Sequence, residues 1–211
     1  MKLSIITVSF NAERAIRNTI ESVLNQSVSV YEYIFIDGDS KDNTVSIIES
    51  YRSKFEEKGI KYIVQSEPDQ GISDAFNKGI RIATGDLIGI INADDELNDN
   101  CVQYLGEVYN TSSADIIYGD CVWRDINGDV YKIPGHEMSK LLYNMILFHP
   151  STFVKKSCYD ECGGFDISYK YCMDKHFLYR CFLKEKKFEY IHKPLTIFKA
   201  GGVSDTHTQD V

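Results

Sequence analysis

The sequence lacks an excess of basic residues. Its 23 Lys and Arg residues are outnumbered by 31 Asp and Glu residues, so the formal net charge at pH 7 is −8. A protein that mainly binds nucleic acid needs a basic face to neutralise phosphates, so nucleic acid is not an expected partner. The charge also argues against adsorption of the whole surface to anionic lipid. The local basic run Lys184–Lys187 is interpreted as a solvated helix end rather than a lipid-binding patch.

The chain also lacks an apolar run long enough for a membrane helix, and it has no segment of signal-peptide type. Its first residues, Met1–Ile6, read directly as a strand. We therefore expect a cytoplasmic protein; peripheral association with the cytoplasmic face of the inner membrane and the oligomeric state are left open. The 211 residues, 43% of them hydrophobic, suit one globular domain with a real core rather than two full domains.

Several nucleotide-binding and nucleophile motifs are absent. The first apolar run, Leu3–Val8, is followed by Ser9–Asn11 and not by Gly-x-Gly-x-x-Gly, so a Rossmann-type dinucleotide site has little support. There is no P-loop and no Gly-x-Ser-x-Gly elbow. Cys158, Cys162, Cys172 and His176 form a loose Cys-x3-Cys…Cys-x3-His pattern. Because the first spacing is wide for zinc, free thiols in ordinary apolar packing are the favoured interpretation.

The first half of the chain alternates strand and helix patterns. Short apolar runs alternate with segments of helical periodicity, and Asn11 is a candidate N-cap for the first helix. The predicted strands are Leu3–Val8, Tyr33–Ile36, Tyr62–Val64 and Leu87–Ile91. The predicted helices carry their apolar residues over 16–24, 45–55 and 72–83. This order predicts βαβ crossovers and a mainly parallel sheet, the mark of an α/β fold.

The second half is predicted as a mixed α+β lobe laid over the open end of the sheet. Short strands are expected at Ile116–Tyr118, Cys121–Trp123 and Val130–Tyr131, the last two joined by the turn Asp125–Asp129. Helices are expected over 138–148 and 174–183, with a closing strand at 195–198. We therefore divide the single domain 1–211 into a first half, 1–98, and a second half, 99–211.

Carboxylates follow the predicted strands. Ligands of parallel sheets bind beyond the carboxyl ends of the strands, where Ser9–Asn11, Asp37–Asp39 and Asn92–Asp95 would meet. The adjacent carboxylates of Asp94 and Asp95 would repel each other unless a cation compensates, and Mg²⁺ or Mn²⁺ prefers such ligands together with phosphates. An exposed acidic turn that caps the next helix is an equally open interpretation.

Two other segments can be interpreted either as ligand-binding or as purely structural. Asp37 can cap the following helix, or its carboxylate can accept a hydrogen bond from a nucleobase N–H. The tight loop Glu67–Gly71 precedes a helix whose first N–H groups are free to bind anions. Taken alone, this loop is better read as an ordinary connection than as part of a nucleotide pocket.

An ordered series of segments carries a family resemblance over nearly the whole chain. The segments are Ser4–Asn11, Ile36–Thr44, Glu67–Gly79, Asn92–Asp95, His149–Pro150, Gly163–Asp166 and Met173–Asp174. In order and spacing they resemble family 2 glycosyltransferases of the GT-A fold, the Rossmann-like fold of transferases that use nucleotide-diphosphate sugars. The order Gly38-Asp39 suits a subgroup associated with bacterial surface polysaccharides, including O-antigen and capsule.

The resemblance implies roles for individual residues. Asp37 resembles the residue that contacts the base, and Asp94 the residue near the ribose or sugar. Asp95 resembles the ligand of a Mn²⁺ or Mg²⁺ ion beneath the diphosphate, and Asp174 resembles the catalytic base. Further donor contacts are implied at Val8, Ser9, Phe10, Asp69, Gly71 and Asn77.

Two histidines stand near the implied acceptor side. His149 is a candidate contact to donor or acceptor, although a purely structural histidine is as well supported. His176 occupies a position where the family often has a second acidic residue, which leaves acceptor specificity open.

The resemblance implies an inverting glycosyltransferase that moves a hexosyl or N-acetylhexosaminyl group. The expected donor is a nucleotide sugar, with UDP favoured, and the expected acceptor is a glycan or lipid-linked oligosaccharide. Two alternatives remain: a nucleotidyltransferase, which should carry a Gly-rich loop after the first strand, and a non-catalytic sugar-nucleotide-binding module, which should lack Asp95 or Asp174.

Overall fold

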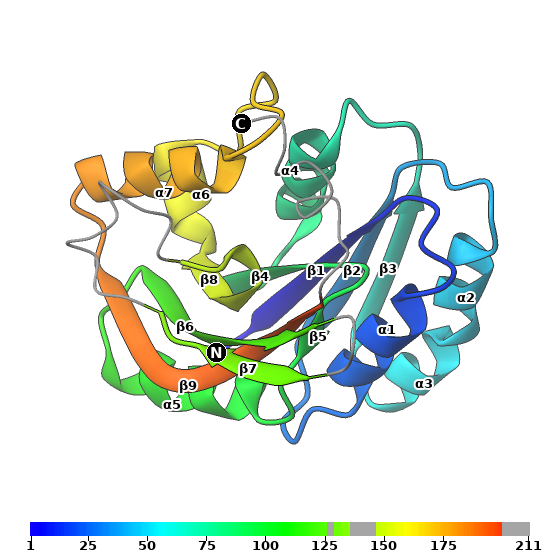
Figure 1. Ribbon diagram of the computed structural model, residues 1–211, viewed down its shortest axis with the longest axis horizontal. Helices are drawn as coiled ribbons and strands as arrows, with labels where there is room; N and C mark the ends of the chain where they lie inside the picture. Colours follow the sequence, from blue (N-terminus) through cyan, green and yellow to red (C-terminus); the bar gives the residue numbers. More distant parts are fainter. Residues whose placement is uncertain (126–128, 136–146, 200–211) are drawn as a thin grey trace.

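The computed structural model describes residues 1–125, 129–135 and 147–199. A single twisted sheet runs through the molecule, with helices on both faces (Figure 1). Within the described residues, no helix is long and apolar enough to cross a membrane.

The first half forms the four parallel strands that the sequence predicts. In chain order its elements are β1 (Leu3–Ser9), α1 (Ile16–Leu24), β2 (Glu32–Asp37), α2 (Thr44–Ser50), α3 (Arg52–Glu57), β3 (Lys61–Ser66), α4 (Ile72–Ile82) and β4 (Leu87–Asn92). The strand order is β3-β2-β1-β4, and all three pairings are parallel. The carboxyl ends of the four strands therefore meet at one edge.

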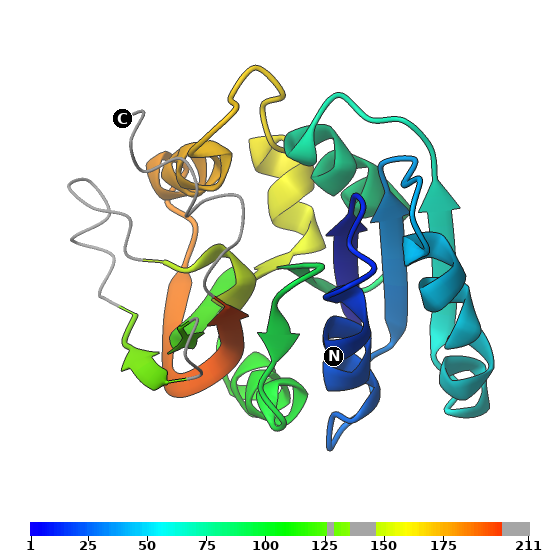
Figure 2. The ribbon, with the colours of Figure 1, turned by 45° about the vertical axis from the view of Figure 1, so that its right-hand side comes forward.

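Side-chain alternation along the strands divides the core into two layers. Leu3 and Ile5 of β1 pack in one apolar cluster with α1, α2 and α3, whereas Ile6 and Val8 pack in a second cluster with α4. A strand that is apolar on both faces needs helices on both sides. Figure 2 shows α1–α3 on the side of the sheet opposite to α4.

Two local predictions in this half are wrong. Asn11 is not the N-cap of α1: its backbone is left-handed (φ 50°), and its side-chain oxygen accepts the Lys41 N–H at 2.9 Å. Helix α1 begins only at Ile16. The second predicted helix is two helices, α2 and α3, which meet at the buried residue Tyr51.

The second half extends the same sheet instead of lying over its open end. Its elements are β5 (Glu96–Leu97), α5 (Cys101–Thr111), β6 (Ile116–Arg124), β7 (Val130–Ile133), the 3₁₀ turn η2 (His149–Ser151), β8 (Thr152–Lys155), α6 (Lys156–Cys162), α7 (Met173–Leu183) and β9 (Phe188–Lys199). The order continues from β4 through β8, β6 and β9 to β5, with β7 paired to β6. Figure 2 shows that this part of the sheet curls away from the parallel strands.

The two short strands predicted at 116–118 and 121–123 are one continuous strand, β6. Its pairing with β9 shifts register around Gly119 and Asp120, where a Cβ on Gly119 would lie 2.5 Å from the Leu195 side chain. The predicted hairpin is present, because β6 and β7 pair from Arg124 and Val130 onward. Residues 126–128 of its turn lie outside the described residues, as do 138–146 of the helix predicted at 138–148; Leu147 and Phe148 are not helical.

Glu32 forms a buried polar centre at the amino ends of the strands. Its fully buried carboxylate accepts hydrogen bonds from the Ser4 hydroxyl at 2.6 Å and from the N–H and hydroxyl of Thr84 at 2.5 and 2.8 Å. Gly85 N–H and the Lys61 ammonium complete the set at 3.2 and 3.3 Å. Burial raises the pKa of this carboxyl, but the hydrogen bonds outweigh burial and hold it below its usual value.

We predict that Glu32→Gln lowers the free energy of unfolding at pH 7 by about 1–3 kcal/mol, because an amide NH₂ would face groups that are already donors. A carboxyl with a lowered folded pKa stabilises the fold above its unfolded pKa, and this stabilisation is lost as the pH falls through the folded value. The difference in the free energy of unfolding between wild type and Glu32→Gln should therefore be constant near neutrality and shrink below about pH 4. Urea denaturation at several pH values, with exposed Glu57→Gln as control, measures it. A pH-independent difference would contradict the role of the charge.

Asn77 joins the two halves of the molecule. Its side-chain NH₂ donates to the Phe165 carbonyl at 2.7 Å, and its side-chain oxygen accepts the Phe165 N–H at 2.8 Å. A Cβ on the neighbouring Gly164 would lie 2.3 Å from the Asn77 oxygen, so the absence of a side chain there allows this approach. Asn77 on α4 therefore fixes the start of the loop that leads to α7.

Asn77→Ala should lower the free energy of unfolding by about 1–3 kcal/mol, since both main-chain groups of Phe165 lose their partners. The matched control is Asn18→Ala on α1, whose exposed side chain makes no hydrogen bond within the described part of the chain. Urea denaturation compares the two variants. Equal, small effects would show that the Asn77 side chain does not hold the loop.

Candidate functional site

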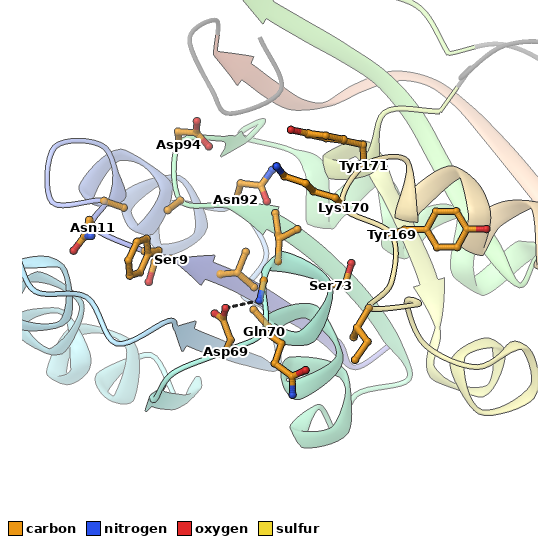
Figure 3. A pocket seen from close by; sticks show the side chains of 18 of the residues that line it. Ser9, Asn11, Asp69, Gln70, Ser73, Asn92, Asp94, Tyr169, Lys170 and Tyr171 are labelled. Carbon is orange, nitrogen blue, oxygen red and sulfur yellow. Dashed lines mark hydrogen bonds between the residues drawn. The ribbon is translucent and has the colours of Figure 1, made fainter. Parts of the chain in front are cut away.

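A cavity of about 750 Å³ opens at the carboxyl ends of β1 and β4. Its wall combines the ends of these strands, the start of α4 and a loop that precedes α7 (Figure 3). Residues from both halves of the chain line it, among them Val8, Ser9, Phe10, Asp69, Gly71, Asn92, Asp94, Lys170 and Phe198. The crevice predicted from the strand order is therefore present, and residues far apart in the sequence meet in it.

The end of β1 supplies one wall as predicted. Val8 and Ser9 are nearly buried and line the cavity, and the Phe10 ring is 65% exposed at its mouth. A large aromatic side chain left in solvent beside a cavity is a candidate stacking surface for a planar ligand.

Asp37 lies behind this wall and is not among the described residues that line the cavity. Its side chain is fully buried, and one carboxylate oxygen accepts the hydroxyls of Ser9 and Ser40 at 2.9 and 2.5 Å. The other oxygen accepts the Ser40 N–H and the Ser66 hydroxyl, both at 2.8 Å. Each oxygen has two bonds, so a nucleobase could bind Asp37 only by displacing one of them. The predicted contact of Asp37 with a base therefore stays a prediction.

The start of α4 supplies a second wall. The Asp69 carboxylate accepts the Gly71 N–H at 2.8 Å and thereby fixes the loop before the helix. Gly71 has φ 108°, a conformation that side chains disfavour. Asp69 also packs on Gly38, where a Cβ would lie 2.7 Å from its carboxylate. Asp69 and Gly71 thus lie in the cavity as predicted, whereas Asn77 is occupied by Phe165 and does not line it.

The acidic turn after β4 splits its two carboxylates between different environments. Asp94 lines the cavity (Figure 3), whereas Asp95 is 1% exposed and is not among the described lining residues. Burial raises the pKa of Asp95 to about 8, with a further contribution from the negative charge of Asp94. Asn92 donates to one Asp95 oxygen at 3.1 Å, and the other oxygen has no hydrogen-bond partner among the described residues.

The residues of this turn fit a divalent cation, and the predicted ligand Asp95 stays a prediction, since one of its buried oxygens has no hydrogen-bond partner among the described residues. Asp94 faces the cavity, and the Asn92 side-chain oxygen is buried there without a hydrogen-bond partner in the described ranges. The described residues contain no cluster of three or more His, Cys, Asp or Glu side chains suited to a metal. One carboxylate with phosphate oxygens from a ligand is a usual Mg²⁺ arrangement. Asp94 offers a carboxylate at the cavity wall, and Asp95 offers a buried one behind it.

Asp174 lies in the first turn of α7, half-buried, and accepts the Lys175 N–H at 2.8 Å. It is not among the described lining residues, but it follows the lining loop Ile167–Tyr171 by three positions. The first turn of a helix favours a negative charge, which a general base requires.

Both predicted histidines stack on aromatic rings. His149 stacks on Phe76, with ring centroids 4.9 Å apart, and meets Phe165 edge to face. Burial lowers the pKa of His149 and the charge of Asp174 raises it, so the two groups are close enough to interact. His176 stacks on Tyr169 at 4.5 Å and thereby supports the cavity loop.

The loose cysteine pattern does not form one site. Cys158 and Cys162 are buried in the apolar cluster beneath α4, whereas Cys172 is exposed. Burial raises the pKa of the Cys158 thiol to about 12, as expected for inert core packing.

Sequence reasoning missed the loop Ile167–Tyr171, which forms the second-half wall of the cavity. Lys170 is the one Lys or Arg among the described lining residues, and its ammonium lies 5.4 Å from the Tyr171 ring centroid. The predicted motifs at 163–166 and 173–174 bracket this loop. The loop has no periodic pattern of its own, and its place in the cavity depends on its two anchors.

The sequence profile described as Glycosyl transferase family 2 matches residues 4–177. A PGL/p-HBAD biosynthesis glycosyltransferase of Mycobacterium tuberculosis is 26% identical over 96% of this chain and 79% of its own length. An uncharacterized glycosyltransferase of the same species is 30% identical over 86% of this chain and 69% of its own length.

Solved structures share the fold. Residues 1–349 of TarS from S. aureus in complex with UDP-GlcNAc superpose with a TM-score of 0.80 at 19% identity, over 100% of this chain and 62% of that one. The mannosyltransferase PcManGT from Pyrobaculum calidifontis, in complex with GDP-Man and Mn²⁺, has a TM-score of 0.69 at 15% identity, over 93% and 56%. The chain thus spans about three fifths of these structures.

These comparisons confirm the predicted GT-A fold and glycosyltransferase activity. They decide against the nucleotidyltransferase alternative, because the matched family transfers glycosyl groups. The match covers both halves of the domain, from the first strand to the helix that carries Asp174. The chain belongs to glycosyl transferase family 2.

Proposed function

We propose that this chain transfers a sugar, with inversion, from a nucleotide-diphosphate sugar to a hydroxyl of a glycan or lipid-linked acceptor. The observation that carries the proposal is the cavity itself, which joins the ends of β1 and β4, the loop before α4 and the second-half loop beside Asp174. Such a cavity can hold an extended donor along the strand ends and admit an acceptor from the second half.

UDP is the favoured nucleotide, and the TarS complexes with UDP and UDP-GlcNAc support this choice. The GDP-Man complex of PcManGT supports a GDP-sugar as the alternative donor. For the acceptor, the relatives named for PGL/p-HBAD biosynthesis support a cell-surface glycan or glycolipid. A bacterial polysaccharide pathway, O-antigen or capsule among them, belongs to the same proposal.

A Mn²⁺ or Mg²⁺ ion would be held by Asp94, with Asn92 beside it, and would stabilise the charge of the diphosphate. The PcManGT complex with Mn²⁺ supports the choice of ion. Asp95 then acts from behind the site: its buried carboxyl accepts the Asn92 NH₂ and so orients the Asn92 side chain.

Asp174 is the proposed general base. The acceptor oxygen attacks the anomeric carbon and its proton passes to the Asp174 carboxylate, while the bond from that carbon to the diphosphate breaks and the nucleotide leaves with the bonding electrons. One displacement on the face opposite the leaving group inverts the anomeric configuration. His149, whose ring is fixed between Phe76 and Phe165, lies near this carboxylate.

We predict that UDP raises the melting temperature of the wild-type protein, and raises it further with Mn²⁺, because ligands that bind only the folded state stabilise it. Asp94→Asn should abolish the Mn²⁺-dependent increment, and Asp95→Asn should retain most of it. A thermal-shift screen with UDP, GDP and their sugars, each with and without Mn²⁺, measures both variants. Loss of the increment in Asp95→Asn alone would restore Asp95 as the ligand.

Asp174→Asn should bind donor as wild type does but turn over at least ~100-fold more slowly, in line with a lost general base. Donor affinity comes from titration calorimetry and turnover from release of nucleotide with a competent acceptor. Asp160→Asn on α6 is the control, since it removes a carboxylate from the same half outside the cavity wall. Unchanged turnover in Asp174→Asn would move the base elsewhere.

A further inference from the structure

Lys170 lines the cavity but has no role in the proposed transfer so far described for Asp94, Asp95 and Asp174. It projects from the loop Ile167–Tyr171 into the cavity, toward the side that carries Asn92 and Asp94 (Figure 3). The backbone of this loop begins just after the Asn77–Phe165 bonds and ends at the first turn of α7. Both ends of the loop are therefore anchored, which keeps the backbone of Lys170 at the cavity wall.

The Lys170 ammonium can offset the negative charge of the cavity wall and of a bound donor. Within the described lining residues, Asp69 and Asp94 are the acidic side chains and Lys170 is the one basic side chain. A nucleotide diphosphate would add about two negative charges, and a divalent cation at Asp94 would offset two. The wall and ligands without Lys170 would then carry an excess of negative charge.

The immediate surroundings of Lys170 leave its ammonium available to bind an anionic ligand. Its ammonium lies 5.4 Å from the centroid of the Tyr171 ring, and no carboxylate within the described ranges forms an ion pair with it. The aromatic face attracts a cation without neutralising its charge. The ammonium can therefore turn to a phosphate without first breaking a salt bridge.

We propose that Lys170 binds the diphosphate of the donor and stabilises the charge that grows on the leaving nucleotide diphosphate as the sugar is transferred. This inference rests on the proposed function. It makes the loop of the second half, as well as the strand ends of the first, part of the donor site. The ammonium acts by electrostatic attraction to the diphosphate oxygens, so an arginine at this position can replace it in part.

Titration calorimetry with UDP, UMP and uridine tests the proposal, with Mn²⁺ held constant, on wild type, Lys170→Met and Lys170→Arg. Lys170→Met should weaken UDP binding about tenfold or more, weaken UMP binding less and leave uridine binding unchanged, because only the diphosphate is near the ammonium. Lys170→Arg should recover most of the loss. The turnover of Lys170→Met should fall roughly 10- to 100-fold.

Two controls separate this result from general effects. Lys54→Met on α3 makes the same change of net charge far from the cavity wall and should bind UDP as wild type does. Thermal melting of the free variants should be unchanged, because the Lys170 side chain is exposed.

Three outcomes would overturn the inference, and each is distinct. UDP affinity and turnover that do not change in Lys170→Met would show that the ammonium does not contact the diphosphate. Equal losses for UDP and uridine would show that Lys170 shapes the cavity and does not recognise charge. Failure of the wild-type protein to bind any nucleotide or nucleotide sugar would instead remove the proposed function, and the inference with it.

Discussion

The hydrogen bonds to the buried Asp37 carboxylate hold the wall of the cavity at the end of β1 in place. It accepts four hydrogen bonds, from the Ser9 hydroxyl on β1, from the N–H and hydroxyl of Ser40, and from the Ser66 hydroxyl on β3. A buried charge is costly unless hydrogen bonds satisfy it, so this side chain holds three neighbouring segments in one arrangement. Ser9 and Phe10 keep their place in the wall because Ser9 is bound from behind.

The acidic turn after β4 holds one buried carboxylate and one carboxylate at the cavity wall. Asp95 lies inside and orients Asn92, whereas Asp94 faces the cavity. Sequence spacing could place both residues at the end of β4, but it could not decide which of two adjacent side chains points outward. The two residues follow β4 in a turn, where the alternation of side chains along a strand no longer applies.

The first half of the fold was predictable because its signals are local. Continuous apolar runs such as Leu3–Val8, separated by amphipathic helices, specify parallel strands without reference to distant residues. The second half was less predictable because its strands depend on partners far along the chain. Half-exposed residues of β9 have no apolar run, and β5 exists only because Glu96 and Leu97 pair with β9.

The same contrast holds for the site. Ser9, Phe10 and Asp94 were placed at the cavity from their positions at strand ends, and the family resemblance implied Val8, Asp69 and Gly71; all six line the cavity. Asn77 was predicted to bind donor, yet its amide is used by the Phe165 main chain, a contact across 88 positions that no local pattern reveals. Lys170 was missed for the complementary reason: its loop reaches the cavity through that same contact.

The Asn77 bonds have a consequence for how this enzyme can diversify. They hold the main chain of Phe165 and so make no demand on the side chains that follow. Apart from Lys170, the side chains between this point and α7 can therefore change while both anchors of the loop stay in place. A lineage could therefore change the cavity wall around Lys170 without disturbing either anchor, and a protein engineer could vary the same positions.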